Sequence, residues 1–301
     1  MISLIQREGV MAMEKILDGR IVVVTGGGRG LGRAMALGYA RAGASGIIVT
    51  AARHPAEIKA VAAEIEAISG PGIALPLVAD VTDRAACVQA VSMVLERFGR
   101  IDVLVNNAGR GQRAMTNDTA PFWEGNPDGW AEIVDTNING PFNMAHSVIR
   151  HMMDRGRGRI LNVTKSRDSM HRPGSTPYGP SKAALEAMTL AWAQDLIGTG
   201  VTVNSIAPGG SVDTEFVLPA SRKRGEKAGK IYMDAEVIAP IAVFLASDAA
   251  NDLTGCRYVG KNWRDDLPPE QAAEAAREPA IFLPPRRDTL LTKPWQATGD
   301  A

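Results

Sequence analysis

The chain carries the sequence IVVVTGGGRGLG at residues 21–32. The β-branched apolar run at its start indicates a buried strand, and the residues from 30 to 42 have the pattern of a helix. Glycine has no Cβ atom, so a turn of this kind brings bare backbone N–H groups to the start of a helix, where they face an anion. The order of strand, turn and helix predicts a site for the phosphates of a dinucleotide. The alternative is a tight turn that binds no ligand.

Apolar strand-like runs alternate with longer amphipathic runs through most of the chain. We expect further strands at 46–50, 73–78, 101–105, 159–164 and 201–207, and helices at 56–68, 84–98, 128–153, 178–197 and 236–246. Pro141 predicts a kink in the longest of these helices. Strands that alternate with helices predict an α/β fold, a single doubly wound Rossmann-type parallel sheet with helices on both faces.

The pattern of strands and helices divides the chain into three expected regions. We expect a leader at residues 1–16, a dinucleotide-binding domain at 17–260 that includes a flap at about 214–234, and a C-terminal extension at 261–301. The basic flap is typical of a solvated surface loop, with contact to an acidic substrate as the alternative. The extension contains a short expected helix at 269–277. It either covers an active site or forms a surface strap without a catalytic role, and the strap is slightly favoured.

Composition excludes several classes of protein. The 301 residues include 33 Lys and Arg against 33 Asp and Glu, so the basic excess of a nucleic-acid binder is absent. No apolar run reaches the roughly 18 residues of a spanning helix. Cys87 and Cys256 are too few for a disulfide framework and lack metal-ligand spacing, so no metal site is predicted. We expect a cytoplasmic protein that binds neither nucleic acid nor a membrane.

The end of the second strand bears on the choice of dinucleotide. An acidic residue there would hold the ribose 2′-OH of NAD(H), but the sequence continues Ala51-Ala52-Arg53. Arg29 and Arg53 are positioned instead to flank a 2′-phosphate, because a guanidinium binds phosphate in a bidentate manner. This favours NADP(H), with NAD(H) still possible; alternatively, Arg53 simply faces solvent.

Tyr178 and Lys182 are four positions apart at the start of an expected helix, so their side chains share one face. A nearby ammonium stabilises a phenolate and is expected to lower the phenol pKa from its usual value near 10. A tyrosine tuned in this way exchanges a proton with a substrate oxygen.

Together, these motifs resemble the short-chain dehydrogenase/reductase family over residues 17 to 255. The resemblance rests, in the order and spacing of the family, on Thr25-Gly26, Gly30, Gly32, Asp80-Val81, Asn106-Asn107-Ala108-Gly109, Asn137, Tyr178, Lys182 and Pro208-Gly209. It implies a nicotinamide cofactor, a small-molecule carbonyl or alcohol substrate, and a homodimer or homotetramer formed through the helices of 128–153 and 178–197.

The resemblance also implies roles for individual residues. Tyr178 is then the general acid/base, Lys182 binds the nicotinamide ribose, and Asn137 holds a water in a proton relay with Lys182. Asp80 meets the adenine edge, and Thr214 holds the carboxamide together with Pro208-Gly209, although it comes one residue later than usual. The predicted cofactor set is Thr25, Gly26, Gly28, Arg29, Gly30, Leu31, Gly32, Arg53, Asp80, Val81, Asn107, Ala108, Gly109, Tyr178, Lys182, Pro208, Gly209 and Thr214.

One position departs from the family. A serine that polarises the substrate oxygen is expected about thirteen residues before the tyrosine, where this chain has Lys165 between Thr164 and Ser166. Ser166 is favoured as the replacement, ahead of Thr164. Lys165 itself is a second candidate, because an ammonium stabilises a developing oxyanion. The third possibility is an impaired enzyme, a dinucleotide-binding sensor or scaffold with little turnover.

Overall fold

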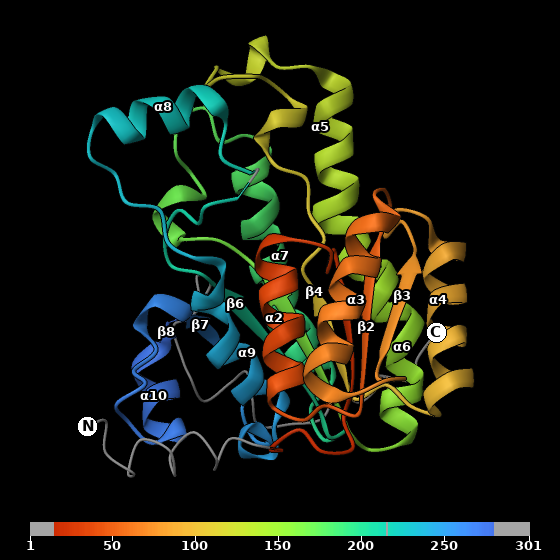
Figure 1. Cartoon of the computed structure of the whole chain (residues 1–301). Coiled ribbons are helices and arrows are strands. Elements are labelled where there is room, and N and C mark those ends of the chain that lie inside the picture. Colours follow the sequence, from red (N-terminus) through yellow and green to blue (C-terminus); the bar gives the residue numbers. More distant parts are fainter. Residues whose placement is uncertain (1–14, 215, 280–301) are drawn as a thin grey trace, which may run out of the picture.

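A computed structural model describes residues 15–214 and 216–279 and has an eight-stranded sheet at its centre (Figure 1). The strand order is β3-β2-β1-β4-β5-β6-β7-β8, parallel from β3 through β7 and antiparallel between β7 and β8. The strands are β1 (Ile21–Thr25), β2 (Gly46–Ala51), β3 (Ala74–Val78), β4 (Val103–Asn106), β5 (Gly158–Val163), β6 (Val201–Ala207), β7 (Arg257–Val259) and β8 (Arg277–Glu278). The predicted doubly wound α/β fold is confirmed.

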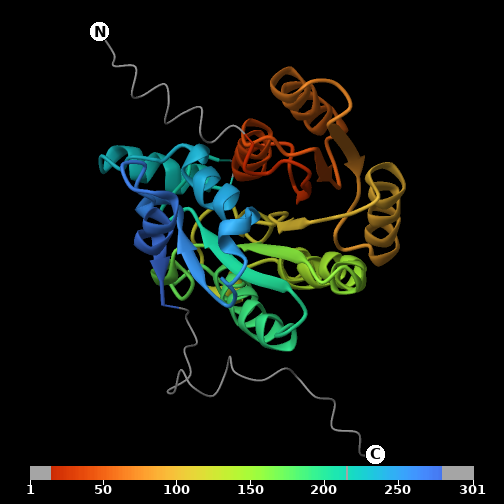
Figure 2. The ribbon, with the colours of Figure 1, turned by 90° about the horizontal axis from the view of Figure 1, so that it is seen from below.

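Helices cover both faces of the sheet (Figure 2). One face carries α2 (Gly30–Arg41), α3 (Pro55–Ser69), α9 (Ala239–Ala246) and α10 (Pro269–Ala276), and the other carries α4 (Arg84–Phe98), α6 (Gly140–Asp154) and α7 (Tyr178–Asp195). Alternate residues of β1 enter the two cores: Val22 and Val24 pack on the α2 side, and Val23 packs on the α4 side. Because both faces are buried, the strand has no polar alternation, as its sequence indicated.

The backbone is helical throughout the stretch expected at 128–153, but a π-helical turn interrupts the regular α-helix just before Pro141. The chain forms α5 (Pro127–Val134), a π-helical turn at Asp135–Asn139, and then α6. Proline has no N–H to donate to the carbonyl group four residues earlier, here that of Asn137, and its ring crowds that carbonyl group. The wider turn accommodates this loss and places Asn137 inside the protein.

The connections after β4 and β6 carry α5 and α8 (Pro219–Lys227), which stand above the carboxyl ends of the strands (Figure 1). The flap therefore contains a helix where the sequence indicated only a surface loop. The sheet continues past residue 260, since β8 belongs to the expected C-terminal extension. Residues 1–14 of the expected leader and residues 280–301 of the extension lie outside the described residues.

The strand order reverses at β1, which has β2 on one side and β4 on the other. In open parallel sheets of this kind, the crevice at the carboxyl ends of the strands on either side of the reversal binds ligands. None of the helices within residues 15–214 and 216–279 combines the length and apolar character that crossing a bilayer requires.

Candidate active site

The glycine turn between β1 and α2 brings backbone into close contact with backbone. Gly26 and Gly30 have φ angles of 63° and 53°, in the left-handed region that favours glycine. A Cβ atom on Gly32 would lie 2.2 Å from the carbonyl oxygen of Gly26, closer than any real contact. The first N–H groups of α2 have no acceptor within the helix and face the cleft. This cradle fits the pyrophosphate of a dinucleotide.

Thr25 and Asn107 hold this turn in place. The Asn107 side-chain amide donates to the carbonyl oxygens of Thr25 and Gly26, both at 2.9 Å. The Thr25 hydroxyl accepts the N–H groups of Asn107 and Ala108, both at 3.0 Å. Thr25 is buried, so it shapes the turn from beneath instead of lining the cleft.

The end of the cleft near β2 has both basic and acidic side chains. Arg53 is exposed and lines the cleft after β2. Arg29 lies 3.5 Å from a carboxylate oxygen of Glu57, in the first turn of α3. The other carboxylate oxygen lies 3.3 Å from where a Gly28 Cβ atom would be. The sequence analysis missed this acid because it considered only the end of the strand and not the helix that follows.

Asp80 and Val81 follow β3 and have different surroundings. The Asp80 carboxylate accepts the backbone N–H and the hydroxyl of Thr82, at 2.9 and 2.8 Å, and lines the cleft. Val81 is buried, and a Cβ atom on Gly140 would lie 2.6 Å from it. Val81 thus packs this loop against α6, while Asp80 remains available to a ligand.

Tyr178 and Lys182 occupy the first turns of α7, beside the end of β5. The Lys182 ammonium donates to the carbonyl oxygen of Val163 at 2.8 Å. A Cβ atom on Gly109 would lie 3.7 Å from the Lys182 Nζ and 3.2 Å from the Asn137 Oδ1. Lys182 and Asn137 therefore approach the same point, and a glycine leaves room for both.

The loop after β4 and helix α7 fix the orientation of the Asn137 side chain through hydrogen bonds. Its Oδ1 accepts the backbone N–H of Arg110 at 2.8 Å, and its Nδ2 donates to the Ser181 hydroxyl at 3.0 Å. The π-helical turn before α6 supplies Asn137, and α7 supplies Ser181. Asn137 and Lys182 are thus brought together in the first turns of α7, the helix that begins at Tyr178.

Burial controls the pKa values of both ionisable groups. It raises the pKa of the Tyr178 phenol to about 12. Burial, and then the charge of Lys165, lowers the pKa of Lys182 to about 8. The expected lowering of the phenol pKa is not observed, because burial disfavours the charged phenolate and raises that pKa. Tyr178 is therefore neutral at physiological pH and able to donate a proton.

Pro208, Gly209 and Thr214 follow β6 and close the cleft from the flap side. A Cβ atom on Gly30 would lie 3.2 Å from the Thr214 methyl group, so Thr214 lies against the glycine turn. Farther along the flap, the Phe216 ring centre lies 6.0 Å from that of Tyr178. The sequence analysis did not identify Phe216, because nothing local distinguishes it from other surface aromatic residues.

Every residue of the predicted site except Thr25 and Asn137 lines a single cleft of about 1510 Å³ at the carboxyl ends of the strands. This exceeds the roughly 300–1,000 Å³ of an ordinary small-molecule site, as a dinucleotide and a substrate together require. Within the described part of the chain, no group of three or more His, Cys, Asp or Glu residues is arranged to hold a metal.

Comparison with known proteins agrees with this geometry. The family model for short chain dehydrogenase matches residues 20–225. The chain is 33% identical over 248 residues to 3-oxoacyl-(acyl-carrier-protein) reductase of Thermotoga maritima, covering 79% of this chain and 95% of that protein. It is 37% identical over 243 residues to acetoacetyl-CoA reductase of Shinella zoogloeoides, covering 78% and 94%. The chain belongs to the short-chain dehydrogenase family.

Solved structures of short-chain dehydrogenases have the same fold. A putative short-chain alcohol dehydrogenase from Sinorhizobium meliloti superposes with a TM-score of 0.72 at 31% identity, covering 82% of this chain and 96% of that one. A metagenomic short-chain oxidoreductase in complex with NADP gives a TM-score of 0.66 at 28% identity, covering 81% and 98%. The chain is thus an NAD(P)-dependent short-chain dehydrogenase that acts on carbonyl or alcohol groups.

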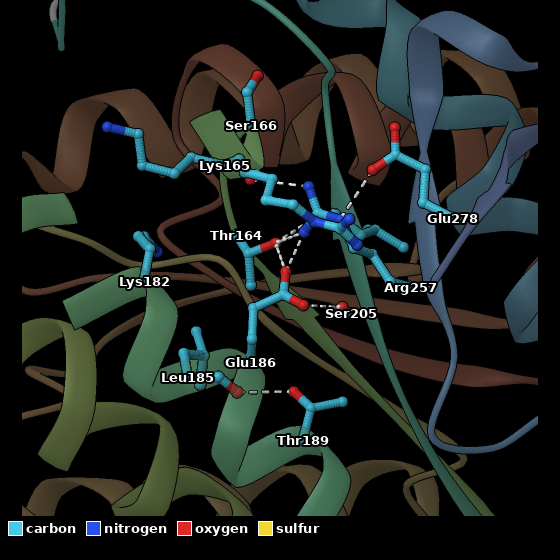
Figure 3. A network of polar contacts seen from close by, with 12 residues as sticks. Thr164, Lys165, Ser166, Lys182, Leu185, Glu186, Thr189, Ser205, Arg257 and Glu278 are labelled. Carbon is cyan, nitrogen blue, oxygen red and sulfur yellow. Dashed lines mark hydrogen bonds and ion pairs between the residues drawn. The ribbon is translucent and has the colours of Figure 1, made fainter. Parts of the chain in front are cut away.

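This short-chain dehydrogenase has Lys165 where the family serine is expected, and Figure 3 shows the surrounding side chains. Thr164 is buried, and its hydroxyl donates to Glu186 at 2.6 Å. The Lys165 ammonium instead lies 4.7 Å from the centre of the Tyr178 ring. It donates to the carbonyl oxygen of Ser169 at 3.1 Å and to the Ser175 hydroxyl at 3.3 Å.

Ser166, which the sequence favoured, also lines the cleft. Figure 3 shows its hydroxyl pointing away from Lys182, whereas Lys165 extends toward the side on which Lys182 lies. Burial, and then the charge of Arg172, lowers the pKa of Lys165 to about 8. Of the two side chains, Lys165 is the one whose polar end lies beside the Tyr178 ring.

Proposed function

We propose that the protein is an NADP(H)-preferring oxidoreductase that interconverts a carbonyl group and a secondary alcohol. The observation that carries this proposal is that Tyr178 and Lys182, at the start of α7, line the same cleft as the glycine turn, with the buried Asn137 beside Lys182. Two relatives are named for the reduction of 3-oxoacyl-(acyl-carrier-protein) and acetoacetyl-CoA, so 3-oxo thioesters are the first substrates to test.

In this mechanism the protein handles the proton and the charge on oxygen. A reduced nicotinamide, when bound, supplies the hydride. Tyr178, whose phenol is neutral, donates its proton to the carbonyl oxygen. Lys182 and a water held by Asn137 then return a proton to the phenolate. The Lys165 ammonium stabilises the negative charge that develops on the substrate oxygen.

The preference for NADP(H) rests on Arg29 and Arg53 at the end of the cleft near β2. Two guanidinium groups there favour a 2′-phosphate, and a structural neighbour is in complex with NADP. Glu57 opposes this preference, because its carboxylate lies beside Arg29 and repels a phosphate. A Glu57→Gln variant should therefore bind NADPH more tightly than the wild type does, with little change for NADH.

A second candidate function is a dinucleotide-binding sensor or scaffold with little turnover, and Lys165 in place of the family serine is the observation that favours it. The test is oxidation of NADPH and NADH with a panel of 3-oxo thioesters, ketones and aldehydes, by wild type and Lys165→Ser in parallel. Turnover by the wild type that the substitution lowers or leaves unchanged supports the oxidoreductase. If the wild type is inactive and the Lys165→Ser variant is active, the result supports the sensor or scaffold.

We also propose that the protein is a homodimer or homotetramer in the cytoplasm. Trp130 on α5, and Phe142 and Met153 on α6, are 41%, 45% and 36% exposed, an apolar set suited to contact with a second copy. Light scattering on a sizing column measures the mass, and a monomer at micromolar concentration would contradict the assembly.

A further inference from the structure

A buried ion pair between Arg257 and Glu186 lies beside the backbone of Lys165 (Figure 3). The side chains of Arg257 on β7 and Glu186 on α7 are only 1% and 2% exposed, and the guanidinium donates to the carboxylate. The same guanidinium donates to the Thr164 hydroxyl at 3.2 Å and to the backbone carbonyl oxygen of Lys165 at 2.9 Å. Arg257 therefore holds Thr164 and Lys165, the two residues that directly follow β5.

The C-terminal extension completes this arrangement. Glu278 on β8 pairs with Arg257 across the sheet, and its carboxylate accepts the Arg257 Nε–H at 3.1 Å. The next residue, Pro279, accepts a hydrogen bond from the Arg167 guanidinium through its carbonyl oxygen. Lys165 is thus connected to the extension through Arg257 and Glu278, and Arg167 is bonded directly to Pro279. Glu278 and Pro279 also line the cleft.

Stability alone does not account for the polar network around Arg257 and Glu186, in which the buried carboxylate has several hydrogen-bond partners. Glu186 also accepts hydrogen bonds from Thr164 at 2.6 Å and from Ser205 at 3.2 Å, so three elements bind one carboxylate. Well-packed apolar side chains in place of a buried ion pair usually give equal or greater stability. A satisfied buried polar network does restrict a segment to one geometry, which apolar packing does less well.

We propose that Arg257 and Glu278 are positioning residues for Lys165. They fix the backbone of the segment from 164 to 167 so that the Lys165 ammonium stays beside the Tyr178 ring. The C-terminal extension is then part of the active site, in contrast to the surface strap favoured from the sequence. The inference rests on the proposed function, since it assigns the network to the orientation of a group that acts in that reaction.

The test compares Glu278→Gln with the matched control Glu274→Gln. Glu278 has a partly exposed side chain, so its substitution removes charge from the network without leaving a wholly buried group unpaired. Glu274 belongs to the same extension and pairs with exposed Arg277 at 3.2 Å, outside the network. The measurements are kcat and KM with a 3-oxo thioester, the NADPH Kd, and the rate at which an acylating reagent labels Lys165, followed by peptide mass spectrometry.

We expect Glu278→Gln to lower kcat by about tenfold or more, since small misplacements of groups that contact the reacting atoms carry costs of up to about a hundredfold. The NADPH Kd should stay within about twofold, because the glycine turn is untouched, and Lys165 labelling should change severalfold. Glu274→Gln should match the wild type in every measurement. Arg257→Lys keeps a cation beside Glu186 but loses the guanidinium fork, so it should fold and show the same kcat defect.

Labelling of Lys165 requires no turnover, and this separates the two proposals. A wild type without activity, in which Glu278→Gln still alters Lys165 labelling, would refute the oxidoreductase and support the positioning network. Wild-type kcat and wild-type labelling in Glu278→Gln, with only a lower melting temperature, would overturn the positioning role.

Discussion

Replacement of Lys165 by methionine should stabilise the fold at neutral pH while it lowers activity. Burial and the charge of Arg172 lower the pKa of this lysine from 10.5 to about 8. This lowering of the pKa corresponds to about 3 kcal/mol, at roughly 1.36 kcal/mol for each tenfold change in proton affinity. Loss of the hydrogen bonds to Ser169 and Ser175 offsets roughly 1 kcal/mol of this gain. The free energy of unfolding should therefore rise by about 1–3 kcal/mol.

The pH dependence identifies the cause of this gain. The native state releases the Lys165 proton near pH 8, whereas the unfolded chain keeps it until about pH 10.5. Between these values the unfolded state binds more protons, so the stability of the wild type rises with pH. The methionine variant lacks this contribution. The difference between the two proteins should be largest below pH 8 and should shrink toward pH 10.5.

Urea unfolding of both proteins at about pH 7 and at about pH 10 provides the measurement. Lys59→Met is the control, because Lys59 is exposed on α3, away from the cleft. It should match the wild type within about 0.5 kcal/mol at both values. A Lys165→Met protein that is less stable than the wild type at neutral pH, or more stable by the same amount at both values, would refute the reasoning.

Three further substitutions test the cofactor cradle, the cofactor preference and the buried network. Gly32→Ala should abolish NADPH binding in a fluorescence titration, because its methyl group would lie 2.2 Å from the Gly26 carbonyl oxygen; an unchanged Kd would contradict the cradle. Arg53→Ala should weaken NADPH binding by roughly tenfold and NADH binding by less than twofold, whereas equal losses would contradict a contact with the 2′-phosphate. Arg257→Met should lower unfolding stability by about 3–5 kcal/mol, and adding Glu186→Met should restore most of it; additive losses would contradict an uncompensated buried charge as the cause.

The fold was predictable because its signals are local. Six of the eight strands, β1 to β6, were predicted from runs rich in apolar residues, and the helices between them show their own periodicity. The short strands β7 (Arg257–Val259) and β8 (Arg277–Glu278) were not predicted, because three and two residues are too few to form such a pattern. The turn at Asp135–Asn139 was not predictable from this periodicity, because a π-helical turn inserts one residue and leaves the apolar spacing on either side almost unchanged. Pro141 was the local signal, and it indicated a kink but not the π-helical turn that precedes it.

The candidate site was predictable where its residues form short motifs. The glycine turn and the pair Tyr178 and Lys182 stand out in the sequence itself, whereas Asn137 was predicted only through the resemblance to the family. Arg257 was not, because its partner Glu186 is 71 positions away and only the fold brings them together. Glu186 lies four residues after Lys182, so a charged side chain on the same face of α7 was the signal available in the sequence.

The most direct test of the central claim follows the hydride. NADPH that carries deuterium at C4, in each of its two stereochemical forms, is incubated with a 3-oxo thioester and the wild type or Tyr178→Phe, and the product is analysed by mass spectrometry. The account predicts one deuterium in the hydroxyl-bearing carbon of the wild-type product, from only one of the two labelled forms. It predicts a rate at least about a hundredfold lower for Tyr178→Phe, with NADPH binding retained. Wild type that binds NADPH but yields no labelled alcohol, or Tyr178→Phe that reacts at the wild-type rate, would contradict it.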